Sequence, residues 1–280
     1  MERSYTGAHL DAGRLLLVTG SKFMQGAAFS GAVLVPAPLA RRLRDGAGVA
    51  SSLPRGMRDY FSRHEMPAEL AHWAAQLHSQ RNEGLLSRWH TALPHLEAVG
   101  AIDEPRRKRL ETAWTDEVLA CVARHPALSV AAVEKGIVSI RCANRHRQAL
   151  TGKRYHGAAT LKSVYRWLTS DMSLAPGADS CAAAGTVVYL GQPVSLTKDE
   201  AVLRIAMGAE LLLQMNGGTY DAAAETVPVE KLAWAVDNFA RIAAWEAGAS
   251  SAASEAAASR ASLDPEAPSK PQRRSSMRSA

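Results

Sequence analysis

The sequence has little cysteine, and the three cysteines it has follow no metal-site or disulfide pattern. Cys121, Cys142 and Cys181 are odd in number, lie far apart and form no CxxC or Cys/His pairing. Disulfide frameworks use even sets of cysteines and zinc sites use closely spaced ones, so the sequence predicts neither. Each cysteine is expected to be a small buried residue.

Long apolar runs are missing as well. No run approaches the ~18 residues needed to cross a bilayer, and the opening stretch MERSYTGAHLDAGR lacks the apolar core of a secretory signal. We therefore expect a cytoplasmic protein without a membrane partner. Its 280 residues, 47% hydrophobic and 21% charged, suffice for one large domain or two modest ones with a proper core.

The charge pattern does not favour a nucleic-acid partner. The net charge of +6 comes partly from a C-terminal Ser/Ala/Pro segment, and without that segment the chain is only mildly basic. A basic run at residues 141–157 has no aromatic interleaving and no known binding module, so a solvated loop is favoured over a phosphate or nucleic-acid site. His90 and His95 are five residues apart, which does not place them on one helical face, and no metal site is predicted.

Hydrophobic patterns predict an α/β chain. Residues 15–18 and 30–35 read as neighbouring antiparallel strands, the first of them buried on both faces. A longer helix is expected to open at Pro67, and another over residues 85–96 has Gly84 and Pro94 as points of interruption. The remaining expected elements are helices at 37–44, 104–124, 158–170 and 230–248 and strands at 137–142, 186–190 and 201–207.

This order of elements predicts three parts. Residues 1–125 are expected to be part of a large domain, and residues 126–248 a small α/β domain with an antiparallel sheet backed by helices. Residues 249–280 form a basic Ser/Ala/Pro tail, a composition that is typical of disorder.

Lys22 is the first candidate for chemistry. It lies between the first two strands, in the stretch LLLVTGSKFMQGAAFSGAVLVP. Ligands of open α/β sheets sit beyond the carboxyl ends of the strands, which is where the Thr19–Lys22 segment is expected. A lysine shielded from water loses its proton more readily, and an uncharged amine can form a Schiff base with a carbonyl. The alternative is a lysine that caps the strand end or pairs with a carboxylate.

Arg204 is the second candidate, because it interrupts the apolar strand AVLRIAM. A charged side chain is costly to bury unless it meets an anion, so it points either to solvent on the polar face or into a site. A guanidinium suits bidentate capture of a carboxylate.

Four stretches together resemble a known family. They are VTGSKFMQGAAFSGAVLVP, NEGLLSRWHTAL at 82–93, YLGQPVSL at 189–196 and AVLRIAMGAELL at 201–212. In this order and spacing they resemble fold-type I pyridoxal-phosphate enzymes of an aminotransferase-like group near the class V aminotransferases. The resemblance spans roughly residues 11–245 and covers the C-terminal portion of such an enzyme.

The resemblance implies roles for six residues. Lys22 corresponds to the lysine that holds pyridoxal phosphate as a Schiff base and moves a proton during amino-group transfer. Arg204 matches the arginine that receives the substrate carboxylate of an amino acid or 2-oxo acid. Cofactor contacts are implied for Thr19, Ser21, Gly20 and Gly26, and family enzymes form homodimers.

The chain also departs from the family pattern. Family members carry a phosphate-cradling helix, an aromatic stacking residue and an aspartate before the lysine strand, and the sequence has no counterpart of them. Residues 25–29 and Met207-Gly208 differ from the family's usual residues as well. The sequence therefore predicts a chain that looks truncated at its N-terminus and is inactive alone. The alternative is a cofactor-free remnant that acts as an interaction protein or has no present function.

Overall fold

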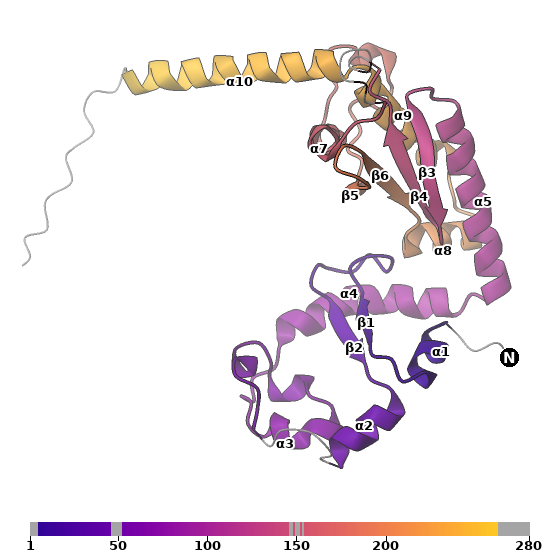
Figure 1. The fold of residues 1–280 in the computed structure, drawn as a ribbon, viewed down its shortest axis with the longest axis vertical. Helices are drawn as coiled ribbons and strands as arrows, with labels where there is room; N and C mark the ends of the chain where they lie inside the picture. Colours follow the sequence, from indigo (N-terminus) through magenta and orange to yellow (C-terminus); the bar gives the residue numbers. More distant parts are fainter. Residues whose placement is uncertain (1–4, 46–51, 146–147, 149–151, 153, 263–280) are drawn as a thin grey trace, which may run out of the picture. The chain divides into compact units, whose positions relative to one another are not determined.

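The computed structural model describes residues 5–45, 52–145, 148, 152 and 154–262. The chain is mixed α/β, as expected, with two small antiparallel sheets, and it divides into two compact units (Figure 1). Unit 1 comprises residues 1–117, 134–137 and 206–222, and unit 2 comprises residues 118–133, 138–205 and 223–280. The sequence expected a boundary at residues 125/126, whereas these units are built from interleaved segments. The predicted domain bounds remain a prediction.

Unit 1 joins a two-stranded sheet to helices from both halves of the sequence. Arg106 of α5 donates a hydrogen bond to the Asn216 carbonyl of α8 at 3.0 Å, so the first turns of α5 are tied to the end of α8. The elements are α1 (Tyr5–Asp11), β1 (Leu16–Thr19), β2 (Gly31–Leu34), α2 (Ala37–Arg44), α3 (Ala71–Ala74), α4 (Glu83–Gly100), the start of α5 (Glu104–Ala123) and α8 (Ala209–Gly217). Three single turns of 3-10 helix precede α3, at Met57–Asp59, Arg63–Glu65 and Ala68–Leu70.

The antiparallel pairing of the first two strands is confirmed, with Leu17 opposite Val33. Their expected burial is wrong. Leu17 is 84% exposed and Val33 is 53% exposed, while Leu16 and Val18, which point to the other face, are half-buried. A parallel sheet covered on both faces would bury all four. The ribbon therefore has one open apolar face.

The helices after β2 differ in part from the expectation. The region from Pro67 forms only a 3-10 turn and the four-residue α3 instead of a longer helix. By contrast, α4 runs unbroken through Pro94. It begins after Asn82, whose side-chain oxygen accepts a hydrogen bond from the Leu85 N–H at 3.0 Å. This cap satisfies an amide that has no partner within the helix.

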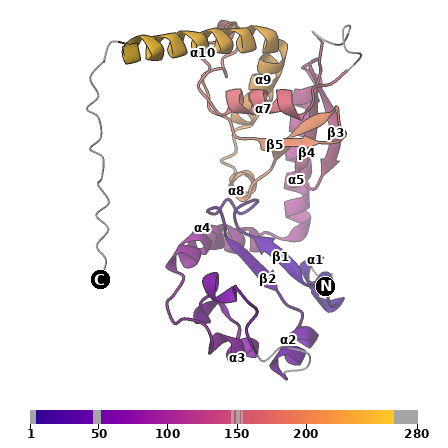
Figure 2. The same cartoon turned by 60° about the vertical axis from the view of Figure 1, so that its left-hand side comes forward.

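Unit 2 is built on a four-stranded sheet in the order β3-β4-β6-β5. Helix α7 contacts β5, as the two views in Figures 1 and 2 show. Its elements are the end of α5, β3 (Leu128–Glu134), β4 (Ile137–Cys142), α7 (Ala158–Leu168), a 3-10 turn at Ala178–Ser180, β5 (Gly191–Ser195), β6 (Ala201–Ala206), α9 (Ala222–Asp237) and α10 (Phe239–Ser262).

Buried side chains of β4 form the centre of the unit 2 core, because buried and half-buried residues alternate strictly along this strand. Val138, Ile140 and Cys142 are fully buried and alternate with half-buried residues, which confirms the strand expected at 137–142. Lys135 and Gly136, both with positive φ, form the turn that joins β3 to β4, a conformation that suits a two-residue hairpin. Buried side chains of α7 and α9 complete the core: Leu161, Val164, Leu168, Val229, Leu232 and Ala235.

Two expectations for this half of the chain are wrong. Residues 186–190 are not a strand, and the neighbouring strand β5 lies just after them. The helix expected at 230–248 is two helices, α9 and α10, which meet at Asn238. Residues 249–262 continue α10, and the rest of the predicted tail, residues 263–280, lies outside the described residues. Within the described part of the chain, no helix has the length and apolar character needed to span a membrane.

Burial of Cys142 predicts a loss of stability at alkaline pH. Desolvation raises the pKa of its thiol from 9.0 to about 12, so between these values the folded chain holds a proton that the unfolded chain has released. The free energy of unfolding should therefore fall as pH rises through this range, by up to about 1.4 kcal/mol per pH unit.

Chemical denaturation of the wild type and of Cys142→Ala at pH 8 to 11 measures the effect. The variant should lose most of the slope, and Cys181→Ala, which removes a half-exposed thiol, should change the slope less. Equal slopes for wild type and Cys142→Ala would contradict the prediction.

Candidate functional site: the lysine loop

Lys22 lies in an exposed turn of the segment that links β1 to β2, residues 20–30, which we call the lysine loop. The Gln25 N–H donates to the Lys22 carbonyl at 2.9 Å and closes the turn. The loop is also closed across its base, because the Gly20 N–H donates to the Ser30 carbonyl at 2.8 Å. The Lys22 side chain at this turn is exposed, not shielded from water as the sequence argument supposed.

Two predicted cofactor residues, Gly20 and Gly26, pack directly against α4. The Gly26 N–H donates to the Gly20 carbonyl at 2.8 Å. A methyl group added at Gly20 would lie 2.7 Å from Cβ of Ala92, and one added at Gly26 would lie 2.6 Å from the same atom. Contacts this short do not occur between real Cβ atoms, so both positions require glycine because the loop touches the helix here.

The other two predicted cofactor residues contact each other. The Thr19 and Ser21 hydroxyl oxygens lie 2.9 Å apart, and the Ser21 N–H donates to the Thr19 hydroxyl at 3.3 Å. A phosphate needs free N–H or O–H donors that converge on it. The hydroxyls bond to one another and the glycines face α4, so these four residues, as arranged, do not fit a phosphate cradle.

The middle of the loop is bound to the start of α8, which is about 185 residues further along the chain. The Ala209 N–H donates to the Phe23 carbonyl at 2.7 Å, and the Glu210 N–H donates to the Gln25 side-chain oxygen at 2.9 Å. Figures 1 and 2 both show the β1–β2 loop beside α4 and α8. These bonds satisfy amides at the first turn of α8 that have no partner within the helix.

Two residues that differ from the usual residues of the resembled family meet at this contact. Gln25 has a positive φ of 52°, and its side chain lies against Gly208, where an added methyl group would come within 2.8 Å of Gln25 Cδ. Gly208 therefore leaves the room that the Gln25 side chain needs. The sequence marked residues 25–29 and Met207-Gly208 as unusual but gave no sign that two of them touch.

His95 of α4 connects the lysine loop to α8 from a third side. Its Nδ1 lies 2.8 Å from the Met24 carbonyl oxygen, and its Nε2 lies 3.2 Å from Oε2 of Glu210. Thr91, one turn earlier on α4, accepts a hydrogen bond from the Ala27 N–H at 3.0 Å. Sequence reasoning missed these residues, because only the fold brings them to the loop.

Arg204 lies in unit 2, at an exposed position of β6 between the buried residues Leu203 and Ile205. It pairs with Gly191 of β5, where an added methyl group would lie 3.2 Å from Arg204 Cβ. The exposed position agrees with one of the two alternatives for Arg204, the polar face of the strand. The predicted role in carboxylate binding stays a prediction.

Lys231 is a buried lysine that the sequence did not single out. Its ammonium group donates to the carbonyls of Leu168, Ser170 and Thr186. Burial lowers the pKa of Lys231, and the neighbouring Asp171 and Cys181 act in the opposite direction. Three carbonyls match the three donors of an ammonium, so Lys231 ties α9 to the segments after α7 and is not a free nucleophile.

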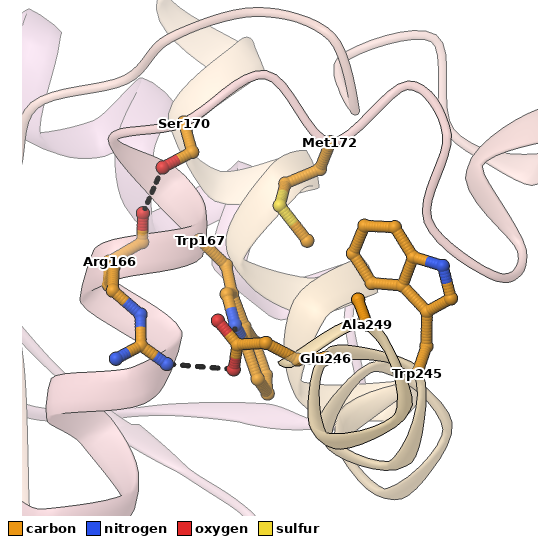
Figure 3. Close-up of a pocket in the computed structure, with 7 residues that line it drawn as sticks. All are labelled: Arg166, Trp167, Ser170, Met172, Trp245, Glu246 and Ala249. Carbon is orange, nitrogen blue, oxygen red and sulfur yellow. Dashed lines mark hydrogen bonds and ion pairs between the residues drawn. The ribbon is translucent and has the colours of Figure 1, made fainter. Parts of the chain in front are cut away.

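A hollow of about 390 Å³ lies between α7 and α10 in unit 2 (Figure 3). Glu246 is held there by two donors, the Arg166 guanidinium at 2.7 Å and the Trp167 indole N–H at 3.2 Å. None of the predicted site residues lines the hollow, whose lining consists of Arg166, Trp167, Ser170, Met172, Trp245, Glu246 and Ala249.

Two further expectations concern metals and the basic run. Over the described residues, no group of three or more His, Cys, Asp or Glu side chains is placed to hold a metal ion. In the basic run, Arg141 pairs with Glu200, and Arg154 lies over the Tyr155 ring at 5.4 Å from its centroid. His146, Arg147 and Lys153 lie outside the described residues.

Comparison of the chain with protein-family models, with curated proteins and with solved structures finds no match in any of the three.

The contact between the glycines and Ala92 predicts a specific loss of stability. Gly26→Ala should lower the free energy of unfolding by about 1 to 3 kcal/mol, because the new methyl group overlaps Ala92. In an Ala92→Gly background the same change should cost less, since the nearest of the three atoms that the methyl group meets is gone. Urea denaturation of the four chains of this double-mutant cycle measures the coupling.

Gly31→Ala is the matched control, because its nearest neighbour, the Val18 carbonyl oxygen, would be 4.0 Å away. It should have little effect. Equal costs for Gly26→Ala with and without Ala92 would show that the two residues do not touch.

Proposed function

We propose that this chain is the C-terminal portion of a pyridoxal-phosphate-dependent, aminotransferase-like protein, with Lys22 as its Schiff-base lysine. The observation that supports this proposal is that Lys22 is an exposed lysine at the carboxyl end of a strand, on a loop bound to α4 and α8. Such a loop can present an amine in one place, which a covalent reaction with an aldehyde requires. The reaction class would be amino-group transfer between an amino acid and a 2-oxo acid.

Arg204 is proposed as the carboxylate anchor. Its side chain is exposed on β6. A planar guanidinium can grip both oxygens of a substrate carboxylate. Because Arg204 and Lys22 belong to different units, their cooperation is part of the proposal.

The groups that hold the cofactor phosphate are proposed to lie outside the lysine loop, since Gly20, Gly26, Thr19 and Ser21 have other partners. The chain alone is therefore expected to hold the cofactor weakly. After addition of pyridoxal phosphate we expect little or no absorbance at about 410 to 430 nm, the range of a protonated Schiff base on lysine. A strong band that Lys22→Ala abolishes would overturn the view that this chain lacks a complete site.

Reductive trapping tests the role of Lys22 itself. The chain is incubated with limiting pyridoxal phosphate and cyanoborohydride, which reduces each Schiff base as it forms and leaves the free aldehyde intact, and modified lysines are mapped by mass spectrometry. Lys22 should be modified well above Lys162, an exposed lysine on α7. Lys22→Arg should remove the main product and Lys162→Arg should not. Modification of both lysines to the same extent would contradict the proposed role.

The open ribbon face favours a second candidate, a cofactor-free protein that associates with a second copy of itself. Leu15, Leu17 and Val33 are all more than half exposed and share one face of the β1–β2 ribbon. Contiguous exposed apolar side chains of this kind mark interaction sites, and a two-fold axis lets one such face cover another.

This candidate predicts that Leu17→Glu converts a dimer to a monomer, because the charge would be buried between two copies. Analytical ultracentrifugation measures the mass. Leu174→Glu is the matched control: Leu174 is 87% exposed in unit 2, and its replacement should leave the dimer intact. A wild-type chain that is monomeric at all concentrations would contradict this candidate.

A further inference from the structure

The hollow between α7 and α10 combines apolar walls with one carboxylate. Figure 3 shows that its lining comes from α7, from the segment after α7 and from α10. The apolar part consists of the Trp167 and Trp245 rings, the Met172 side chain and the Ala249 methyl group. Trp167 and Met172 are buried, whereas Trp245 is 40% exposed. The volume of about 390 Å³ falls within the range of small-molecule sites.

Contacts behind the lining hold two of its residues in place. The Trp167 ring packs on the Phe239 ring, with the ring centroids 5.1 Å apart. The Ser170 carbonyl accepts a hydrogen bond from the buried Lys231 ammonium at 2.7 Å. A ligand that enters a preformed site loses less affinity to the ordering of the protein. This side of the hollow is therefore ready to receive a molecule without rearrangement.

Glu246 supplies a hydrogen-bond acceptor in the hollow. The Arg166 guanidinium and the Trp167 indole N–H both donate to its Oε2, at 2.7 and 3.2 Å, and they orient the carboxylate. Among the described residues, Oε1 of Glu246 has no hydrogen-bond partner, so it can accept a bond from a ligand. Arg166 balances the charge of the carboxylate. A neutral donor is favoured over a cation, because Arg166 would repel a cation.

We propose that this hollow binds a small neutral aromatic molecule with one N–H or O–H donor, of the indole or phenol kind. Its ring lies against the Trp245 ring and the Met172 thioether, since aromatic rings attract both kinds of group. Its donor bonds to Oε1 of Glu246. The site goes beyond the proposed cofactor chemistry and does not depend on it, because neither Lys22 nor Arg204 lines the hollow.

Titration of the full chain with three probes, followed by saturation-transfer NMR of the probe signals, tests the proposal. Indole should bind saturably with a Kd of about 0.1 to 1 mM, as expected of a fragment of this size. Benzofuran has the same ring shape with an oxygen in place of the N–H, and it should bind about 3- to 10-fold more weakly because it cannot donate to Glu246. Tryptamine, which adds an ammonium group, should bind no more tightly than indole.

Three variants locate the binding. Trp245→Ala should weaken indole binding about 3- to 10-fold, because it removes one wall of the hollow. Glu246→Leu keeps a side chain of similar size but no acceptor, so indole and benzofuran should then bind equally. Tyr189→Ala is the matched control: Tyr189 is 79% exposed in the same unit and does not line the hollow, and its replacement should leave indole binding unchanged.

The absence of saturable indole binding up to about 5 mM would overturn the proposal, and so would equal wild-type affinities for indole and benzofuran. An equal loss in Trp245→Ala and Tyr189→Ala would show that indole adheres to exposed aromatic side chains in general. Tighter binding of tryptamine than of indole would assign the hollow to an organic cation instead. If a variant does not fold, judged by circular dichroism, the comparison of the three probes on the wild type decides.

Discussion

The close contact of Gly20 and Gly26 with Ala92 is the constraint on which the lysine loop depends. Packed atoms cannot overlap, so a backbone lying this near a helix requires residues without Cβ on the loop and a small one on the helix. Once the loop touches α4 at Ala92, Thr91 and His95 on the same helix come within hydrogen-bonding distance of its backbone. The small residues around Lys22 thus have a packing cause that requires no ligand.

The same constraint joins parts of unit 1 that are far apart in sequence. Gln25 and the Phe23 carbonyl supply partners for the first amides of α8, and Gly208 leaves space for the Gln25 side chain. Each interaction alone is worth little against the entropy of ordering a loop. Together they bond the loop to α4 and α8 at several points, which gives the Lys22 backbone a defined position even though its side chain is exposed.

Unit 2 places two basic side chains in different environments, one buried and one exposed. Lys231 is fully buried, but it meets one carbonyl for each N–H that it donates, so its charge costs less than an unpaired one would. Arg204 is exposed, because it occupies an outward-facing position of β6. A basic side chain in an apolar stretch can therefore be structural when it lies inside and available for binding when it lies outside.

Hydrophobic patterns predicted the secondary structure correctly where a segment's own residues decide it. Alternation in Ile137–Cys142 and AVLRIAM identified two strands, and the apolar runs beside Lys22 identified the β1–β2 pair. The patterns predicted the wrong secondary structure where packing against other segments decides it. Residues 186–190 have strand-like composition but do not pair, because the neighbouring GQPVS takes the place beside β6. The region from Pro67 has helical spacing but forms only single turns and a four-residue helix.

For the candidate site, the sequence by itself singled out Lys22 as the candidate amine and showed that small residues surround it. Only the tertiary structure decided what the small residues do, that Gln25 meets Gly208, and that His95 lies between Met24 and Glu210. The physical reason is that a glycine allows its backbone to lie close to another segment, but its identity does not say which segment that is. Partners more than a hundred residues away, such as His95 and Glu210, are chosen by the packing of whole helices.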